Sequence, residues 1–156
     1  MIKLRNILFP TDFSDLSKHA LIYVRSFAES YKADVHVLHV VDEAYQYWMA
    51  HGPEMMPVGP PPEDVVEACK KEMTRFVGDH LYGWQCTVHQ SVALGRPYLE
   101  IIRYAREKKI DLIILGTHGR SGLKHALLGS VAERIVRKSP CPVLTIRDPE
   151  HEFVMP

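Results

Sequence analysis

The chain has 156 residues, a length typical of one domain built around a single hydrophobic core. Hydrophobic residues make up 46% of the chain and charged residues 24%, a balance that excludes a disordered or membrane-embedded protein. The 19 lysines and arginines are matched by 19 aspartates and glutamates, so the chain lacks the positive field that attracts nucleic acid or anionic lipid. We therefore expect no nucleic acid and no membrane among its partners.

The first predicted elements are a strand, a helix and a second strand. Residues 7–9 form a short apolar run that ends at Pro10, which is typical of a strand buried on both faces. A helix is predicted from Ser14 onward, because apolar residues recur there at helical spacing: Ala20, Leu21, Val24, Phe27 and Ala28. The β-branched residues of 35–41 predict the second strand, which an acidic turn at Asp42 and Glu43 follows.

Residues 44–62 interrupt this pattern with five prolines and several aromatic and methionine side chains. A loop of this length inside a compact domain is usually a functional lid or a linker, and both interpretations stay open. A helix is predicted to begin near Glu63 and to be closed by Gly78 and Gly83. Its apolar stripe comprises Val66, Cys69, Met73, Phe76 and Val77.

Three strands and two helices are predicted in the second half of the chain. A strand at 87–92 precedes a helix whose first turn contains Pro97, where the missing N–H has no cost. The apolar run 112–115 predicts a buried strand. A last helix is predicted to begin at Ser130, after a glycine-rich segment, and residues 142–146 form the final strand.

The alternation of strands with helices predicts the fold class. It indicates an α/β protein with a doubly wound, open parallel sheet flanked by helices on both faces. We expect a single domain over residues 1–148, with an insertion at 44–62 and a tail at 149–156. Such sheets bind ligands beyond the carboxyl ends of their strands, where the strand order reverses. The loops after the first, second and fourth strands are therefore the candidate site.

The loop before the last helix contains four glycines, which are Gly116, Gly119, Gly122 and Gly129. Glycine lets the backbone approach a ligand closely, and the helix start at Ser130 adds unpaired N–H donors and the positive end of the helix dipole. Together these features predict a phosphate-binding loop. The segment matches neither G-x-x-x-x-G-K-[ST] nor G-x-G-x-x-G, which argues against a P-loop NTPase and a dinucleotide fold.

The spacing G-x2-G-x9-G-S over 116–130 resembles that of the universal stress protein family, in its ATP-binding branch. Three further segments carry the resemblance: Ile-Leu-Phe-Pro-Thr-Asp-Phe-Ser at 7–14, His-Val-Val-Asp at 39–42 and Ser-Pro-Cys-Pro-Val-Leu at 139–144. The resemblance implies a Rossmann-like sheet of five parallel strands in the order 3-2-1-4-5. It also implies a homodimer formed through the last strand, Val143 to Ile146, which suits an apolar sheet edge.

The resemblance also implies a ligand site. Asp12, with Pro10 and Thr11 beside it, would lie against the ribose and adenine, and the backbone near Val40 would recognise the adenine edge. The phosphates would be held by residues of the glycine-rich segment and the helix start: Gly116, His118, Gly119, Arg120, Gly129, Ser130 and Val131. The expected ligand is ATP, ADP or AMP, with or without Mg²⁺. No residue is assigned a catalytic role.

Some of these residues have simpler explanations that the sequence leaves open. Asp12 suits a turn or a helix cap after the first strand. Ser130 and Glu133 form S-x-x-E, the pattern of a capping box, which would stabilise the last helix with or without a ligand. His118 and Arg120 suit a solvated loop as well as a contact with a nucleotide.

Metal and thiol chemistry are not predicted. His36 and His39 are three residues apart on a strand and therefore point to opposite faces, so they do not form a metal-binding pair. Cys69, Cys86 and Cys141 have no C-x-x-C spacing and are interpreted as buried thiols in a reducing compartment. The early apolar stretch is too short for a signal peptide, and we expect a cytoplasmic protein.

The sequence thus predicts an adenine-nucleotide-binding regulatory module rather than a dedicated enzyme. Neither G-x-S-x-G nor H-E-x-x-H occurs, so nucleophilic and metal-dependent hydrolysis lack visible machinery. Three alternatives stay open. They are a nucleotide-independent dimer acting through residues 44–62, a slow ATPase or nucleotidyl hydrolase using His118 or Asp12, and a carrier of FMN.

Overall fold

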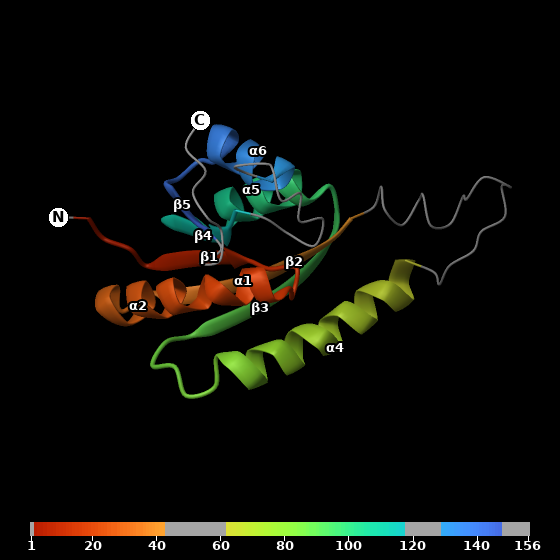
Figure 1. The fold of residues 1–156 in the computed structure, drawn as a ribbon, viewed down its shortest axis with the longest axis horizontal. Coiled ribbons are helices and arrows are strands. Elements are labelled where there is room, and N and C mark those ends of the chain that lie inside the picture. Colours follow the sequence, from red (N-terminus) through yellow and green to blue (C-terminus); the bar gives the residue numbers. More distant parts are fainter. Residues whose placement is uncertain (1, 43–61, 118–128, 148–156) are drawn as a thin grey trace, which may run out of the picture.

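The computed structural model describes residues 2–42, 62–117 and 129–147, and these contain one parallel sheet (Figure 1). The order of its five described strands is β3-β2-β1-β4-β5, and each neighbouring pair is parallel. The strands are β1 (Asn6–Pro10), β2 (Asp34–Asp42), β3 (Val88–Gly95), β4 (Leu112–Gly116) and β5 (Val143–Ile146). The predicted fold class and strand order are confirmed.

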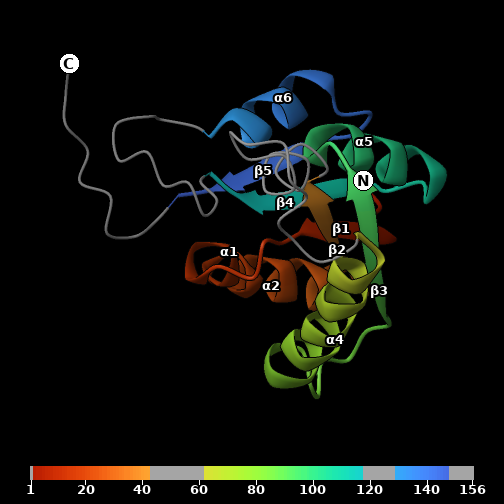
Figure 2. The same ribbon diagram turned by 90° about the vertical axis from the view of Figure 1, so that its right-hand side faces the viewer.

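Helices cover both faces of the sheet (Figures 1 and 2). One face carries α1 (Asp15–His19), α2 (Leu21–Tyr31) and α4 (Pro62–His80). The other face carries α5 (Pro97–Glu107) and α6 (Ser130–Lys138). None of the helices in the described part of the chain combines the length and the apolar character needed to cross a membrane.

The core consists of two apolar clusters separated by the sheet. The central strand β1 contributes to both, because successive side chains of a strand point to opposite faces. Ile7 and Phe9 pack toward α2 and α4, Leu8 packs toward α5 and α6, and all three are fully buried. This explains why β1 has an uninterrupted apolar sequence, as predicted for a strand covered on both sides.

The helix predicted from Ser14 onward is two short helices. Ser14 is the N-cap of α1, and its hydroxyl accepts a hydrogen bond from the backbone N–H of Ser17. The chain tightens at Ala20, whose N–H bonds to the carbonyl of Ser17, three residues back, and α2 then begins at Leu21. The apolar pattern alone does not reveal this break, because its buried residues, Ala20, Leu21, Val24 and Ala28, all lie at or after it.

Two other predicted boundaries are wrong. Gly78 lies inside α4, which continues to His80, whereas Gly83 lies in the following turn with a left-handed φ of 79°. The third strand was expected at 87–92, but β3 runs from Val88 to Gly95 and pairs with β2 over its whole length. The predicted insertion at 44–62 falls almost entirely, and the tail at 149–156 entirely, outside the described residues.

Candidate functional site

The candidate site lies at the carboxyl ends of β1, β2 and β4. The chain leaves β1 toward one face of the sheet and leaves β4 toward the other, so the strand order reverses between these neighbours. This is the place where doubly wound sheets bind their ligands. Of the predicted site residues, the structure brings eight to this edge: Pro10, Thr11, Asp12, Val40, Gly116, Gly129, Ser130 and Val131. His118, Gly119 and Arg120 lie outside the described residues.

The turn after β1 is held by hydrogen bonds of small polar side chains. Asp12 Oδ1 accepts from the N–H of Ser14 at 3.1 Å and from the Ser14 hydroxyl at 2.5 Å. The hydroxyl of the buried Thr11 lies 2.9 Å from that of Ser17 and accepts from the N–H of Phe13 at 3.0 Å. Asp12 therefore has the turn role that its sequence position allowed.

The backbone N–H and C=O of Val40 lie past the point where β1 ends. The ladder between β1 and β2 ends at Pro10 and Leu38, after which the N–H of Thr11 donates to the Leu38 carbonyl at 2.9 Å. The N–H and C=O of a strand residue point to one neighbouring strand, and those of the next residue to the other. Val40 lies two residues beyond Leu38, so its N–H and C=O point to the same side as those of Leu38, past the last residue of β1.

The loop after β4 is closed at its base by backbone hydrogen bonds. The N–H of Thr117 donates to the Ile146 carbonyl at 2.9 Å, and the Thr117 carbonyl accepts from the N–H of Gly129 at 2.7 Å. The start of α6 is thereby fixed to the end of β4. The Gly129 N–H is therefore engaged within the protein.

The first turn of α6 presents backbone donors. Gly129 is the N-cap, and its carbonyl accepts from the N–H of Glu133 at 2.9 Å. Within the described residues, the N–H groups of Ser130, Val131 and Ala132 have no hydrogen-bond partner, as expected for the start of a helix. These donors and the positive end of the helix dipole can bind an anion.

The predicted capping box at the start of α6 is wrong. Ser130 is the first helical residue rather than the N-cap, so its hydroxyl is not placed to accept from Glu133. The Glu133 carboxylate instead forms an ion pair with Arg137, one turn further on, at 3.1 Å. The N-cap Gly129 has no side chain that could accept from the first N–H groups of α6.

Sequence reasoning did not find the contact between Phe13 and His39. The imidazole stacks on the Phe13 ring with centroids 4.4 Å apart, and its Nδ1 lies 2.8 Å from the Thr11 carbonyl. A carbonyl oxygen only accepts, so Nδ1 carries the proton and donates. His39 was considered as a metal ligand and set aside. The signal that could have revealed the contact is that both residues belong to segments that carry the family resemblance.

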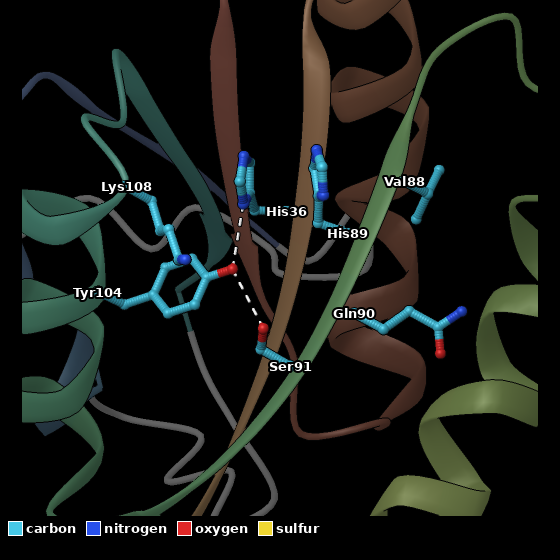
Figure 3. A pocket seen from close by; sticks show the side chains of 7 residues that line it. All are labelled: His36, Val88, His89, Gln90, Ser91, Tyr104 and Lys108. Carbon is cyan, nitrogen blue, oxygen red and sulfur yellow. Dashed lines mark hydrogen bonds between the residues drawn. The ribbon is translucent and has the colours of Figure 1, made fainter.

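A polar pocket of about 570 Å³ lies away from this edge and contains none of the predicted site residues (Figure 3). The Tyr104 hydroxyl from α5 lies 3.0 Å from Nδ1 of His36 and 3.1 Å from the hydroxyl of Ser91, so it bridges β2 and β3. The rings of His36 and His89 stack with centroids 4.4 Å apart. Burial, and then the neighbouring His89, lower the pKa of His36 to about 4, so the imidazole is neutral at pH 7.

The described residues hold no group of three or more metal-binding side chains, and His36 and His39 point to opposite faces of β2 as predicted. None of the three cysteines forms a disulfide, and all are half-buried rather than fully buried as predicted. Burial raises the pKa of the Cys86 and Cys141 thiols, so both are protonated at pH 7. Neither is suited to act as a nucleophile.

The fold and this edge define a doubly wound α/β domain whose candidate site combines backbone groups with a small turn. The universal stress protein family model matches residues 3–147, and the chain belongs to that family. Universal stress protein MJ0531 of Methanocaldococcus jannaschii is 36% identical over 149 residues, covering 95% of this chain and 85% of the relative.

The fold also matches solved structures of relatives. The structure of protein MJ0577, also from Methanocaldococcus jannaschii, superposes with a TM-score of 0.80 at 30% identity and covers 96% of this chain and 99% of that one. Two others share the fold alone. A universal stress protein in complex with cAMP has a TM-score of 0.67 at 20% identity, covering 94% of this chain and 98% of that one. The Archaeoglobus fulgidus protein in complex with dAMP has a TM-score of 0.62 at 19% identity, covering 93% and 98%.

Proposed function

We propose that this chain is an adenine-nucleotide-binding regulatory module that acts as a homodimer in the cytoplasm, with ATP as the first ligand to test and ADP and AMP next. The observation that carries the proposal is the convergence of three features at one sheet edge. These are the outward backbone groups of Val40, the turn at Asp12 and the uncapped start of α6. The N–H and C=O of Val40 complement the donor and acceptor on the adenine edge.

The phosphates would lie at the first turn of α6. The N–H groups of Ser130 and Val131 supply donors there, and the helix dipole favours negative charge. Gly116, at the end of β4, leaves room for a close approach. We assign His118, Gly119 and Arg120 to the same phosphate site, with Mg²⁺ as a companion of the phosphate oxygens.

Relatives support an adenine nucleotide rather than another phosphate ester. The complexes with cAMP and dAMP are formed by proteins of this fold, and the two ligands share an adenine base, a sugar and one phosphate. In the proposed site of this chain, Val40 would face the base, Asp12 the sugar and the start of α6 the phosphate. The regulatory role is the leading proposal, with slow ATP hydrolysis as the alternative.

Calorimetric titration with ATP, ADP, AMP and cAMP tests the proposal. We expect at least one of them to bind with a dissociation constant on the order of 1 µM, near −8 kcal/mol. Ligand at roughly 100 times that constant should stabilise the fold by about 2.7 kcal/mol and raise the melting temperature. If no nucleotide gives heat or a thermal shift, the proposal fails. Phosphate release at a rate set by protein concentration would favour the slow ATPase.

The variant Asp12→Asn tests the ribose contact separately. Its amide oxygen still accepts the two bonds from Ser14, so the turn is retained, while the charge that would accept from ribose hydroxyls is lost. We expect ATP affinity to fall about five- to tenfold. Asp15→Asn is the matched control, because that exposed carboxylate pairs only with Lys18 among the described residues, and its ATP affinity should equal that of the wild type.

A further inference from the structure

The turn that carries Asp12 is attached to β2 through the side chain of His39. The His39 Nδ1–H donates to the carbonyl of Thr11, the residue before Asp12, at 2.8 Å. The same imidazole stacks on Phe13, the residue after Asp12, with 27° between the ring planes. One side chain of β2 therefore contacts both neighbours of Asp12, while Val40, the next residue along the strand, points to the opposite face.

Phe13 has a backbone conformation that needs support. Its φ is 63°, in the left-handed region that costs a non-glycine residue conformational energy. The Thr11 hydroxyl accepts its N–H at 3.0 Å, and its ring packs between His39 and Phe76 of α4, whose centroid lies 5.5 Å away. The left-handed φ of Phe13 turns the chain between Asp12 and Ser14, whose N–H and hydroxyl donate to the Asp12 carboxylate.

We propose that His39 and Phe13 are positioning residues that hold the Asp12 turn in the geometry needed for the adenosine part of the ligand, and that they do not affect the phosphate part. The inference rests on the proposed function and adds that separate groups of residues support the adenosine part and the phosphate part of the site. The adenosine half depends on this cluster between β1, β2 and α4, whereas the phosphate half depends on the base of the loop at Thr117 and Gly129.

Titration of His39 variants with ATP and with inorganic tripolyphosphate distinguishes the two halves. In His39→Leu the hydrogen bond to Thr11 and the aromatic stack are both lost, and we expect ATP affinity to fall about tenfold or more. Tripolyphosphate affinity should stay within about twofold, because its donors lie on α6. In His39→Asn the amide N–H can still reach the Thr11 carbonyl, so part of the ATP affinity should return.

Each outcome has a defined meaning. If the wild type binds neither ligand, the proposed function fails before the positioning role is tested. If the wild type binds ATP and His39→Leu binds it equally well, the positioning role is wrong. Equal losses for ATP and tripolyphosphate would also overturn it, since they would indicate general disruption of the fold.

Two more variants keep the test valid if His39→Leu does not fold. Phe13→Leu retains an apolar side chain but removes the stack on His39, and it should weaken ATP and spare tripolyphosphate in the same way. His36→Gln is the matched control, because His36 lies on the same strand, faces the other side of the sheet and contacts Tyr104 instead. Its affinities for both ligands should equal those of the wild type.

Discussion

His36 is a buried histidine held neutral by its surroundings. The residue is 6% exposed, and titratable groups on β2, on β3 and just after α5 face it. Burial is the main cause of its low pKa, His89 on β3 and Lys108 after α5 lower it further, and Asp34 on β2 opposes them. A neutral Nδ1 can accept from the Tyr104 hydroxyl, which joins α5 to β2 and β3.

This environment predicts an acid-sensitive contribution to stability. The folded-state pKa of about 4 lies below the unfolded value of 6.5, so between these values the unfolded chain binds more protons. The free energy of unfolding should therefore fall as the pH drops through this window, by up to about 3 kcal/mol from His36. Urea unfolding of wild type and His36→Gln from about pH 7 to about pH 4.5 measures the difference. If both lose stability in parallel, His36 is not responsible.

At the residue scale, the sequence predicted which residues lie at the candidate site but not the hydrogen bonds and ring contacts that they form. The strand pattern predicted which loops form the candidate site, the family resemblance implied Asp12 and Val40 within them, and the structure places both at that sheet edge. The N-cap of α6 is Gly129 rather than the predicted Ser130. This difference is a one-residue shift of the helix start, which no pattern of residue types determines. The pairing of His39 with Phe13 depends on which strands are neighbours, and that is a tertiary fact.

Two glycines near the end of α4 show how an element boundary affects stability. Both were predicted to close the helix, but only Gly83, with its left-handed φ, lies beyond the end. Gly78 is inside the helix, and a Cβ added there would meet nothing within 4 Å. A Cβ at Gly83 would also meet nothing within 4 Å, so the two positions differ in backbone conformation rather than in space.

The two positions should therefore respond in opposite directions to the same substitution. Gly78→Ala should raise the free energy of unfolding by about 0.5–1 kcal/mol, because alanine is the better helix former and loses less entropy. Gly83→Ala should lower it by about 1 kcal/mol, because a Cβ disfavours the left-handed region. Chemical denaturation of both variants measures the pair, and a stabilising Gly83→Ala would contradict the assigned turn.

At the element scale, the sequence pattern predicted every described strand and the helices α4, α5 and α6, but it predicted α1 and α2 as one helix and misplaced some boundaries. The apolar stripe of 20–28 begins at the break itself and belongs to α2, so it carries no information on whether the residues before Ala20 form the same helix or a separate one. Likewise β3 continues past Val92 because its neighbour β2 extends to Asp42 and supplies partners as far as Gly95. The length of β3 is therefore set by its partner strand β2.

At the scale of the whole molecule, the free edge of β5 is where we expect a second copy to pair. Hydrogen bonds from Ile113 to the Pro142 carbonyl and from Thr117 to the Ile146 carbonyl show that even-numbered residues of this segment face β4. The backbone groups of Val143 and Thr145 therefore point away from β4, and no described strand pairs with them. Two such edges can pair about a twofold axis.

The variant Thr145→Pro should weaken a dimer of this kind without disturbing the sheet. Proline removes an N–H that points outward and leaves the bonds to β4 in place. Because each substitution acts in both copies, the dimer dissociation constant should rise about tenfold or more. Thr145→Val keeps the N–H and serves as the control. Sedimentation or light scattering at several concentrations measures both, and an unchanged Thr145→Pro dimer would rule out pairing through β5.

The hydrogen bond between Thr117 and Gly129 has a consequence for how this scaffold can diverge. It joins the end of β4 to the start of α6, so the two ends of the intervening segment are held at one point of the fold. Lengthening a closed segment has a small entropic cost, about 0.6 kcal/mol for each doubling. The stretch between these two residues can accordingly be replaced or extended in evolution, or exchanged in the laboratory, to change what the protein recognises while the remainder folds as before.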